Sequence, residues 1–234
     1  MFVLPSSRHP LLALAVACAL AGCGGVEQEA ASPARTLTPV PVSQVDHERI
    51  AQQLYLAYLG RAAEPAGLAY FADVSRQAAL PMDMGAAYFR YGVENGVRQV
   101  LDSLAESPEA VALYSGSDAA AVTAMYRNLF NRDPDPGGLA YWSGALSSGA
   151  LRRGQIPVAL LAGAALADLQ AFDRKTDLAV AFTAALDTPE RMAAYQRDSG
   201  VAALRQVLAK VSAATTDAEL RALVDEALAA ITRG

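Results

Sequence analysis

Chemically reactive side chains are scarce in this 234-residue sequence. It has two cysteines, Cys18 and Cys23, and two histidines, His9 and His47. A chain cleaved before Cys23 therefore keeps a single histidine and has no pair of thiols for a disulfide. A Ser–His–Asp triad or a histidine-rich metal site would have to rely on His47 alone. We expect no enzyme, no metal and no cofactor.

Positive charge is also sparse. Lysine and arginine together number 19 against 24 acidic residues, which gives a net charge of −5. There are two lysines, Lys175 and Lys210, and the arginines are scattered along the chain. Because binding to nucleic acid requires a basic face, nucleic acid is not expected as a partner.

Aromatic residues make up 7% of the chain, whereas hydrophobic residues make up 53% and are mostly alanine and leucine, which favour helices. No segment alternates β-branched and polar residues between hairpin turns, as strands do. The predicted fold class is all-α, a helical bundle built from two related helical units plus C-terminal helices.

The first 22 residues are predicted to be a secretory signal. Arg8 precedes an uncharged apolar run, residues 11–20, that is too short to cross roughly 30 Å of hydrocarbon. The sequence Leu-Ala-Gly-Cys at 20–23 resembles the lipobox of bacterial lipoproteins. The resemblance implies cleavage between Gly22 and Cys23, acylation of Cys23 and, because Gly24 follows, sorting to the outer membrane. An ordinary signal peptide that ends near a cysteine is the alternative.

Residues 23–45 are predicted to be the lipidated cysteine and a flexible linker, because they contain three prolines, many small residues and no helical period. An internal repeat follows. Tyr55 and Arg61 match Tyr126 and Arg132 at an offset of 71, and the Gly-Leu-Ala-Tyr motif at 67–70 recurs at 138–141. The predicted units are 46–116 and 117–197, with C-terminal helices over 198–234 packed on the second unit.

Each repeated position has a structural interpretation. Gly60 and Asn131 tolerate the left-handed conformation of a helix C-cap. Glu64 and Asp135, each followed by proline, are typical of a helix start. Gly67 and Gly138 fall in the first turn of that helix, where a missing side chain allows close packing. The apolar residues that share the buried face of the preceding helices are Ile50, Leu54, Ala57, Tyr58, Val122, Met125, Leu129 and Phe130.

Other repeated residues have two interpretations. Arg61 and Arg132 could contact a ligand, but each lies three residues before an acidic cap, so an ion pair that braces the turn is favoured. The pairs Tyr70–Phe71 and Tyr141–Trp142 could line a sugar-binding groove, but their helical spacing favours the core.

Asn131, Asp133 and Asp135 alternate as ligands do in a calcium loop. An EF-hand would need glycine and glutamate where this chain has Pro136 and Trp142, so a capped turn between helices is favoured over calcium.

Residues 48–197, and residues 125–149 most clearly, resemble bacterial proteins that carry domain of unknown function 4214. The shared pattern is a helix with Tyr, then Arg, a short acidic turn and Gly-Leu-x-Tyr-Trp. The resemblance implies a helical module of secreted and surface-layer proteins and no reaction. We therefore expect a lipid-anchored envelope lipoprotein that binds a protein or glycan at the cell surface. The alternative is an envelope hydrolase that cleaves cell-wall polymers with Asp and Glu carboxylates.

Overall fold

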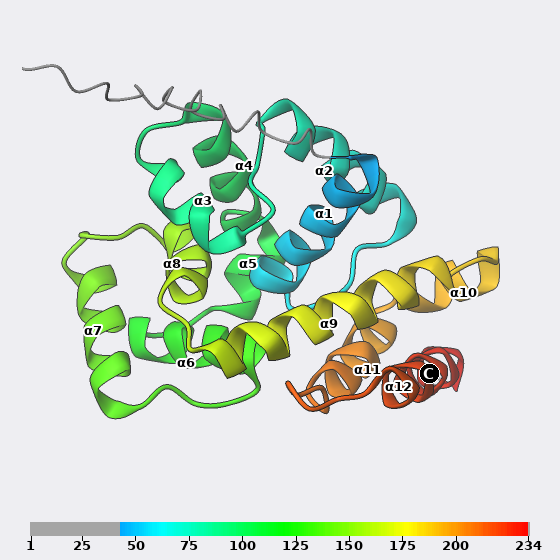
Figure 1. The fold of residues 1–234 in the computed structure, drawn as a ribbon. Coiled ribbons are helices and arrows are strands. Elements are labelled where there is room, and N and C mark those ends of the chain that lie inside the picture. Colours follow the sequence, from blue (N-terminus) through cyan, green and yellow to red (C-terminus); the bar gives the residue numbers. More distant parts are fainter. Residues whose placement is uncertain (1–42, 234) are drawn as a thin grey trace, which may run out of the picture. The chain divides into compact units, whose positions relative to one another are not determined.

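The computed structural model describes residues 43–233, which fold into α-helices and one short 3-10 helix with no strand among them (Figure 1). The all-α prediction is confirmed. The elements in chain order are α1 (Gln44–Leu59), α2 (Pro65–Gln77), α3 (Met84–Tyr91), α4 (Asn95–Ala105), α5 (Pro108–Leu113), α6 (Asp118–Phe130), α7 (Pro136–Ser147), η1 (Arg153–Gln155), α8 (Ile156–Ala162), α9 (Leu166–Ala184), α10 (Pro189–Tyr195), α11 (Asp198–Leu208) and α12 (Asp217–Arg233). The signal and lipidation site at Gly22 and Cys23 lie outside the described residues.

The order of helices repeats. α1 packs on α2 in the first half, and α6 packs on α7 in the second. Equivalent helices also meet across the two halves, because α1 packs on α6 and α3 packs on α8. The two halves therefore share one hydrophobic core rather than forming separate bodies.

Helix α1 begins earlier than the sequence predicted. The predicted linker reached Val45, but the helix starts at Gln44 with Ser43 as its N-cap. The Ser43 hydroxyl accepts from the backbone of Asp46 at 3.2 Å, and the Asp46 carboxylate accepts from the backbone of Ser43 at 2.9 Å. This reciprocal capping box fixes the start, so the linker prediction is wrong for residues 43–45.

The predicted buried faces are confirmed. All eight apolar residues assigned to the faces of α1 and α6 are at most 6% exposed. The last two helices and the residues just after α11 bury apolar residues at helical spacing, and Leu223 and Leu228 on the same face of α12 are half-buried. The buried residues are Leu204, Val207, Leu208, Val211, Leu220, Val224, Ala227 and Ile231. α12 packs on α9 and α10, and α11 packs on α10 and α12.

The repeat is broken at α7. Its counterpart α2 packs on α4 as well as on α1 and buries Ala72 and Ser75. Helix α7, in contrast, packs mainly on α6 and buries no residue completely. Helix α9 packs on α1, α6 and α12 instead of on α7. Figure 1 shows α7 at the edge of the bundle, on the opposite side from α10.

Within residues 43–233 no single helix is long and apolar enough to cross a membrane. The segment Arg153–Ala162 and helix α9 pass the test of length and composition together, with a bend of 114° between them.

Candidate functional site

The two tyrosine-to-arginine segments form the same hairpin. In the first, the guanidinium carbon of Arg61 lies 5.0 Å from the ring centre of Tyr55, and Phe71 meets that ring edge-on at 5.5 Å. In the second, Arg132 lies 5.2 Å from the ring centre of Tyr126. Each arginine therefore covers the tyrosine of the preceding helix in a cation–π contact.

Trp142 occupies the position of Phe71 and makes a different contact. Its indole nitrogen donates to the hydroxyl of Tyr126 at 3.1 Å. Phe71 has no donor, so the Tyr55–Phe71 contact is between rings alone. Burial raises the pKa of Tyr55 to about 12, and the negative charge of Glu64 adds to the rise.

Close packing explains the repeated glycine. A Cβ atom on Gly67 would lie 2.1 Å from the hydroxyl oxygen of Tyr55. The same atom on Gly138 would lie 3.3 Å from the hydroxyl of Tyr126. The predicted close approach is therefore present in both hairpins, and the first is much tighter.

Both predicted helix caps adopt the left-handed conformation, with φ of 62° at Gly60 and 54° at Asn131. Asn131 has a second role that glycine could not fill. Its side-chain nitrogen donates to the carbonyls of Leu208 at 3.0 Å and Val211 at 2.7 Å, which ties the end of α11 to the turn.

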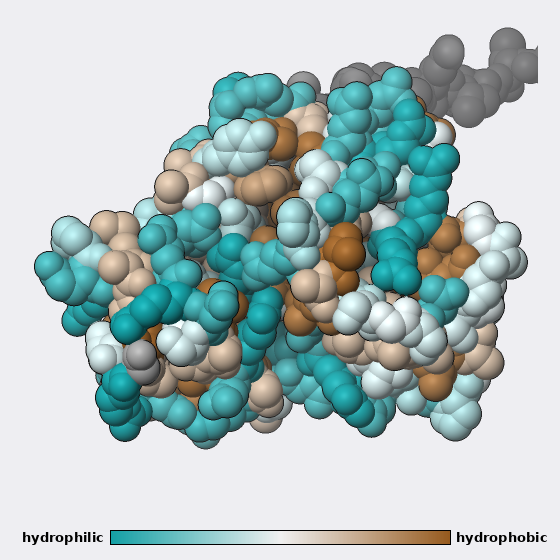
Figure 2. All heavy atoms as spheres, turned by 180° about the vertical axis from the view of Figure 1, so that it is seen from behind, coloured by the Kyte–Doolittle hydropathy of each residue, from teal (hydrophilic) through white to brown (hydrophobic). Residues whose placement is uncertain are grey.

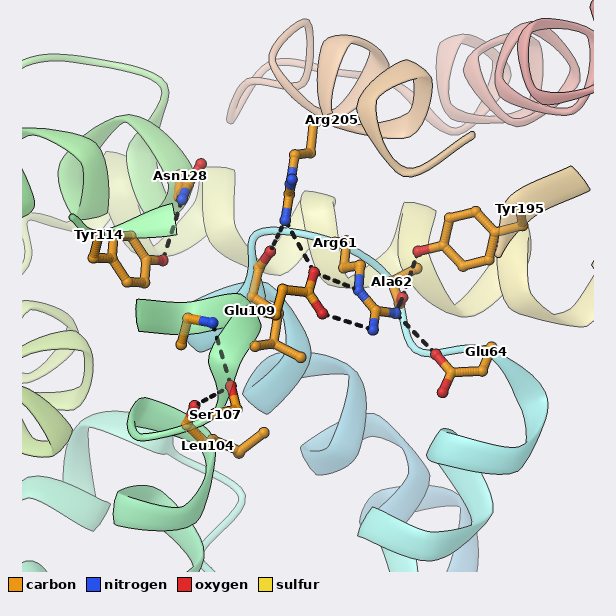
Figure 3. A network of polar contacts seen from close by, with 12 residues as sticks. Arg61, Ala62, Glu64, Leu104, Ser107, Glu109, Tyr114, Asn128, Tyr195 and Arg205 are labelled. Carbon is orange, nitrogen blue, oxygen red and sulfur yellow. Dashed lines mark hydrogen bonds and ion pairs between the residues drawn. The ribbon is translucent and has the colours of Figure 1, made fainter. Parts of the chain in front are cut away.

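Arg61 is the centre of a polar cluster (Figure 3). Its Nε and Nη2 atoms donate to the two carboxylate oxygens of Glu109 at 2.8 and 2.9 Å, and Nη1 donates to Glu64 at 2.8 Å. Arg205 of α11 donates to Glu109 at 3.0 Å and to the carbonyl of Leu59 at 2.7 Å. The cluster joins three segments far apart in sequence, so the bracing role predicted for Arg61 extends beyond its own turn.

The partner predicted for Arg132 is wrong. Arg132 does not pair with Asp135 but with Asp168 in the first turn of α9, through bonds of 2.9 and 2.6 Å. Asp135 is engaged as the N-cap of α7, where it accepts from the backbone of Gly138 at 2.9 Å. That bond lowers the pKa of Asp135, and the hydrogen bond to Asp168 raises the pKa of Arg132.

The N-caps of α2 and α7 differ because the two acidic residues have different partners. Glu64 occupies the N-cap position of α2 but makes no capping bond, because its carboxylate accepts from Arg61 instead. An acidic residue before proline therefore predicts the helix start correctly in both units, but its side chain serves the helix only in the second.

The turn between α1 and α2 is covered by side chains of the second unit. Tyr195 donates to the carbonyl of Ala62 at 2.6 Å, and Thr183 donates to the carbonyl of Ala63 at 2.6 Å. Gln52 completes the enclosure by donating to Thr183 at 2.8 Å and accepting from the backbone of Ala63 at 3.0 Å. Tyr195 repeats Tyr114 at an offset of 81 in the sequence, so the repeat points to this tyrosine, whereas nothing in the sequence pattern singles out Gln52 or Arg205.

The three oxygen-bearing residues of the turn between α6 and α7 have separate partners. Asn131 donates to the end of α11, Asp135 caps α7, and Asp133 accepts from Arg127, which lowers its pKa. Within residues 43–233 no three His, Cys, Asp or Glu side chains come together as a metal site would require. The geometry therefore favours the capped turn over a calcium loop.

A groove of about 670 Å³ lies beside the cluster and is lined by Arg61, Glu109, Asp198 and Arg205, among others. A glycosidase needs one carboxyl that is free to donate a proton and a second that is free to act as base or nucleophile. Glu109 is instead held by two guanidinium groups. The groove therefore offers no support for the hydrolase alternative.

The paired aromatics differ from the prediction. Tyr70 is 64% exposed and Tyr141 is 66% exposed, so the expectation that both members of each pair lie in the core is wrong for the tyrosines. Phe71 and Trp142 pack against the core and hold the tyrosine rings edge-on, with ring centres 5.1 and 4.8 Å apart. On an amphipathic helix adjacent residues point in different directions, so one of each pair faces outwards.

Fold and repeated hairpin together define an all-α repeat module. Residues 101–165 match the model of a family described as "Domain of unknown function (DUF4214)". The match runs from the end of α4 through α8 and so contains the second hairpin complete. The search of curated proteins and the search of solved structures each find no match.

Proposed function

We propose that this protein is a lipoprotein of the bacterial outer membrane whose helical domain binds other envelope molecules without catalysis. The lipid on Cys23 fixes the location, the segment that follows gives reach, and the bundle presents the binding surface. Several acyl chains, each stabilised by about 0.8 kcal/mol per buried CH₂ group, hold such a protein at the membrane durably.

One observation supports the binding role above the others. The repeated geometry of the hairpin uses Tyr55, Arg61, Tyr126 and Arg132 inside the fold, yet the Gly-Leu-Ala-Tyr motif of each unit also exposes its tyrosine ring, Tyr70 or Tyr141. Burial does not require these two rings. Exposed tyrosines contribute large contact area at low entropic cost, which is why they are enriched at binding surfaces.

The rest of the surface fits this role. Figure 2 shows the face opposite to Figure 1, where hydrophobic residues are interspersed among hydrophilic ones. The net charge of −5 also disfavours non-specific attachment to anionic polymers. A binding surface built on a few exposed rings is consistent with both features.

Metabolic labelling with an alkyne analogue of palmitate tests the anchor. The wild-type protein should be labelled and should sediment with membranes, and Cys23→Ala should lose both properties. Cys18→Ala is the matched control, because it removes the other cysteine of the leader and should remain labelled. Membrane retention of an unlabelled Cys23→Ala protein would refute the lipid anchor.

Photo-crosslinking in intact envelopes tests the binding role. A photoreactive phenylalanine analogue placed at Tyr70 or Tyr141 should give discrete crosslinked species. The same analogue at Thr232, an exposed residue of α12, is the control and should give none. Equal crosslinking at all three positions would contradict a dedicated binding surface.

A further inference from the structure

The exposed ring of Tyr70 lines a groove on the surface of the bundle. The groove lies between α2 and α4, has a volume of about 350 Å³, and opens to solvent. Its polar lining consists of Gln77, Gln99 and Ser103, and its apolar floor includes Val74 and Val100. This is the size of a site for a small ligand or for one or two units of a polymer.

Close contact of the two helices forms the floor of the groove. A Cβ atom on Gly96 of α4 would lie 3.5 Å from both the Cα and the Cβ atom of Ala78, just beyond the end of α2. Small residues at this crossing keep the groove shallow and bring Tyr70 on one helix opposite Gln99 and Ser103 on the other.

The lining is polar but carries no Asp, Glu, Lys, Arg or His among the described residues. Amide and hydroxyl groups both donate and accept hydrogen bonds, and therefore match ligands whose groups do the same. Within residues 43–233 the side chain of Gln99 makes no hydrogen bond to another residue, and the side chain of Gln77 uses only its nitrogen, which donates to Asp73. Acceptor oxygens on both amides are thus available to a ligand.

From this combination we infer that the groove between α2 and α4 binds a neutral saccharide, with the ring of Tyr70 stacked on a sugar face and Gln77 and Gln99 bonded to its hydroxyls. The inference rests on the proposed binding role and names its ligand class. A sugar ring has an apolar face and a rim of hydroxyls that both donate and accept, which fits one aromatic ring beside uncharged amides. A proline-rich peptide fits less well, because grooves for such peptides are lined by several aromatic rings.

Phe71 sets the orientation of the Tyr70 ring. The two rings meet at 86° with their centres 5.1 Å apart, and Phe71 is itself packed against the core. A ring held in this way loses little freedom when a ligand stacks on it, which favours affinity.

The second unit provides a matched comparison. Tyr141 is as exposed as Tyr70 and is held by Trp142 in the same manner. Helix α7, however, has no counterpart of α4 beside it, so the ring stands on an open helix. The inference therefore predicts saccharide binding through Tyr70 and not through Tyr141.

Saturation-transfer NMR on the domain lacking the first 22 residues tests the assignment. The probes are neutral oligosaccharides of glucose, galactose, mannose, rhamnose and N-acetylglucosamine, with trigalacturonic acid as the charged comparison. At least one neutral oligosaccharide should show transfer, and Tyr70→Ala should weaken its binding about tenfold, the upper range for one aromatic contact. Gln99→Ala should weaken it as well, whereas Tyr141→Ala should leave it unchanged.

The outcomes separate the two proposals. Failure of every neutral oligosaccharide to bind the wild-type domain would overturn the saccharide assignment, while crosslinking at Tyr70 in envelopes would still support a binding role. Equal loss in the Tyr70 and Tyr141 variants would overturn the groove as the site. Binding of a proline-rich peptide that depends on Tyr70 would overturn the ligand class.

Discussion

Arg61 and Glu109 face each other across 48 residues of sequence and are joined by two parallel hydrogen bonds of 2.8 and 2.9 Å. The side chain of Arg61 is 14% exposed and that of Glu109 is 34% exposed, so this pair is partly shielded from solvent. It links the turn after α1 to the first turn of α5, and Arg205 extends it to α11. The repeated arginine thus holds together parts of the chain that the sequence places far apart.

Replacing Arg61 should destabilise the fold more than replacing Arg132. Arg61→Ala removes hydrogen bonds to both Glu109 and Glu64, which are partly shielded from solvent, and should cost about 2 kcal/mol. Arg132 pairs with one carboxylate, Asp168, and its own side chain is 45% exposed, so Arg132→Ala should cost about 1 kcal/mol. Urea unfolding with an unchanged m-value measures both. Equal losses in the free energy of unfolding for the two variants would contradict the central position of Arg61.

Replacing each repeated glycine with alanine should change the stability of the protein differently in the two hairpins. In Gly67→Ala the new atom would lie 2.1 Å from the Tyr55 hydroxyl, so the hairpin must shift, at about 1–3 kcal/mol. In Gly138→Ala the nearest atoms lie at 3.1 and 3.3 Å, and replacing a helical glycine gains up to about 1 kcal/mol. Thermal unfolding should show a clear loss only for Gly67→Ala.

Trp142 reports on the second hairpin because it is the sole tryptophan. Tyr126→Phe removes the acceptor of its indole nitrogen, and the loss should cost about 1 kcal/mol. The fluorescence emission maximum of Trp142 should shift in the folded state of this variant. Tyr55→Phe is the control, because it alters the other hairpin and should leave the emission maximum unchanged.

Lys175 should make stability depend on pH. Its ammonium group is buried in the bundle and donates to the carbonyl of Asn128 at 2.6 Å, and burial lowers its pKa from 10.5 to about 7. The unfolded chain therefore binds a proton that the folded chain lacks between about pH 7 and 10.5. The contribution of Lys175 to the free energy of unfolding should rise with pH in this window, by at most about 1.4 kcal/mol per pH unit, and level off below it. Buried tyrosines such as Tyr55 and Tyr195, whose pKa values burial raises, oppose this rise as the pH nears 10.

Lys175→Met should flatten this rise, because methionine does not titrate. Lys210→Met is the control, because Lys210 lies at the surface beside Glu226 and should leave the slope in place. Urea unfolding at several pH values measures the slope. Equal slopes in the wild type and in Lys175→Met between pH 7 and 9 would contradict the burial of Lys175.

Local signals in the sequence predict much of this structure. Period, caps and proline positions identify α1, α2, α6 and α7 and the buried faces of α1 and α6, because these features act within a few residues. The sequence did not predict the partner of Arg132, since Asp168 lies 36 residues away and reaches it only through the packing of α9. The exposure of Tyr70 and Tyr141 escaped prediction for a related reason. Both rings lie next to a residue that faces the core, and periodicity alone does not show which of two adjacent aromatics is covered.

The most direct test of the whole account compares two double variants in one experiment, with unfolding temperature and crosslinking in envelopes measured on the same proteins. Tyr70→Ala with Tyr141→Ala should unfold within a few degrees of the wild type, because exposed side chains contribute about 0.5 kcal/mol or less. It should also lose the species that crosslink through a probe at Ser103, an exposed residue that lines the same groove as Tyr70. Arg61→Ala with Arg132→Ala should unfold well below the wild type. A tyrosine double variant that keeps its crosslinked species, or that unfolds as early as the arginine double variant, would contradict the division between bracing and binding residues.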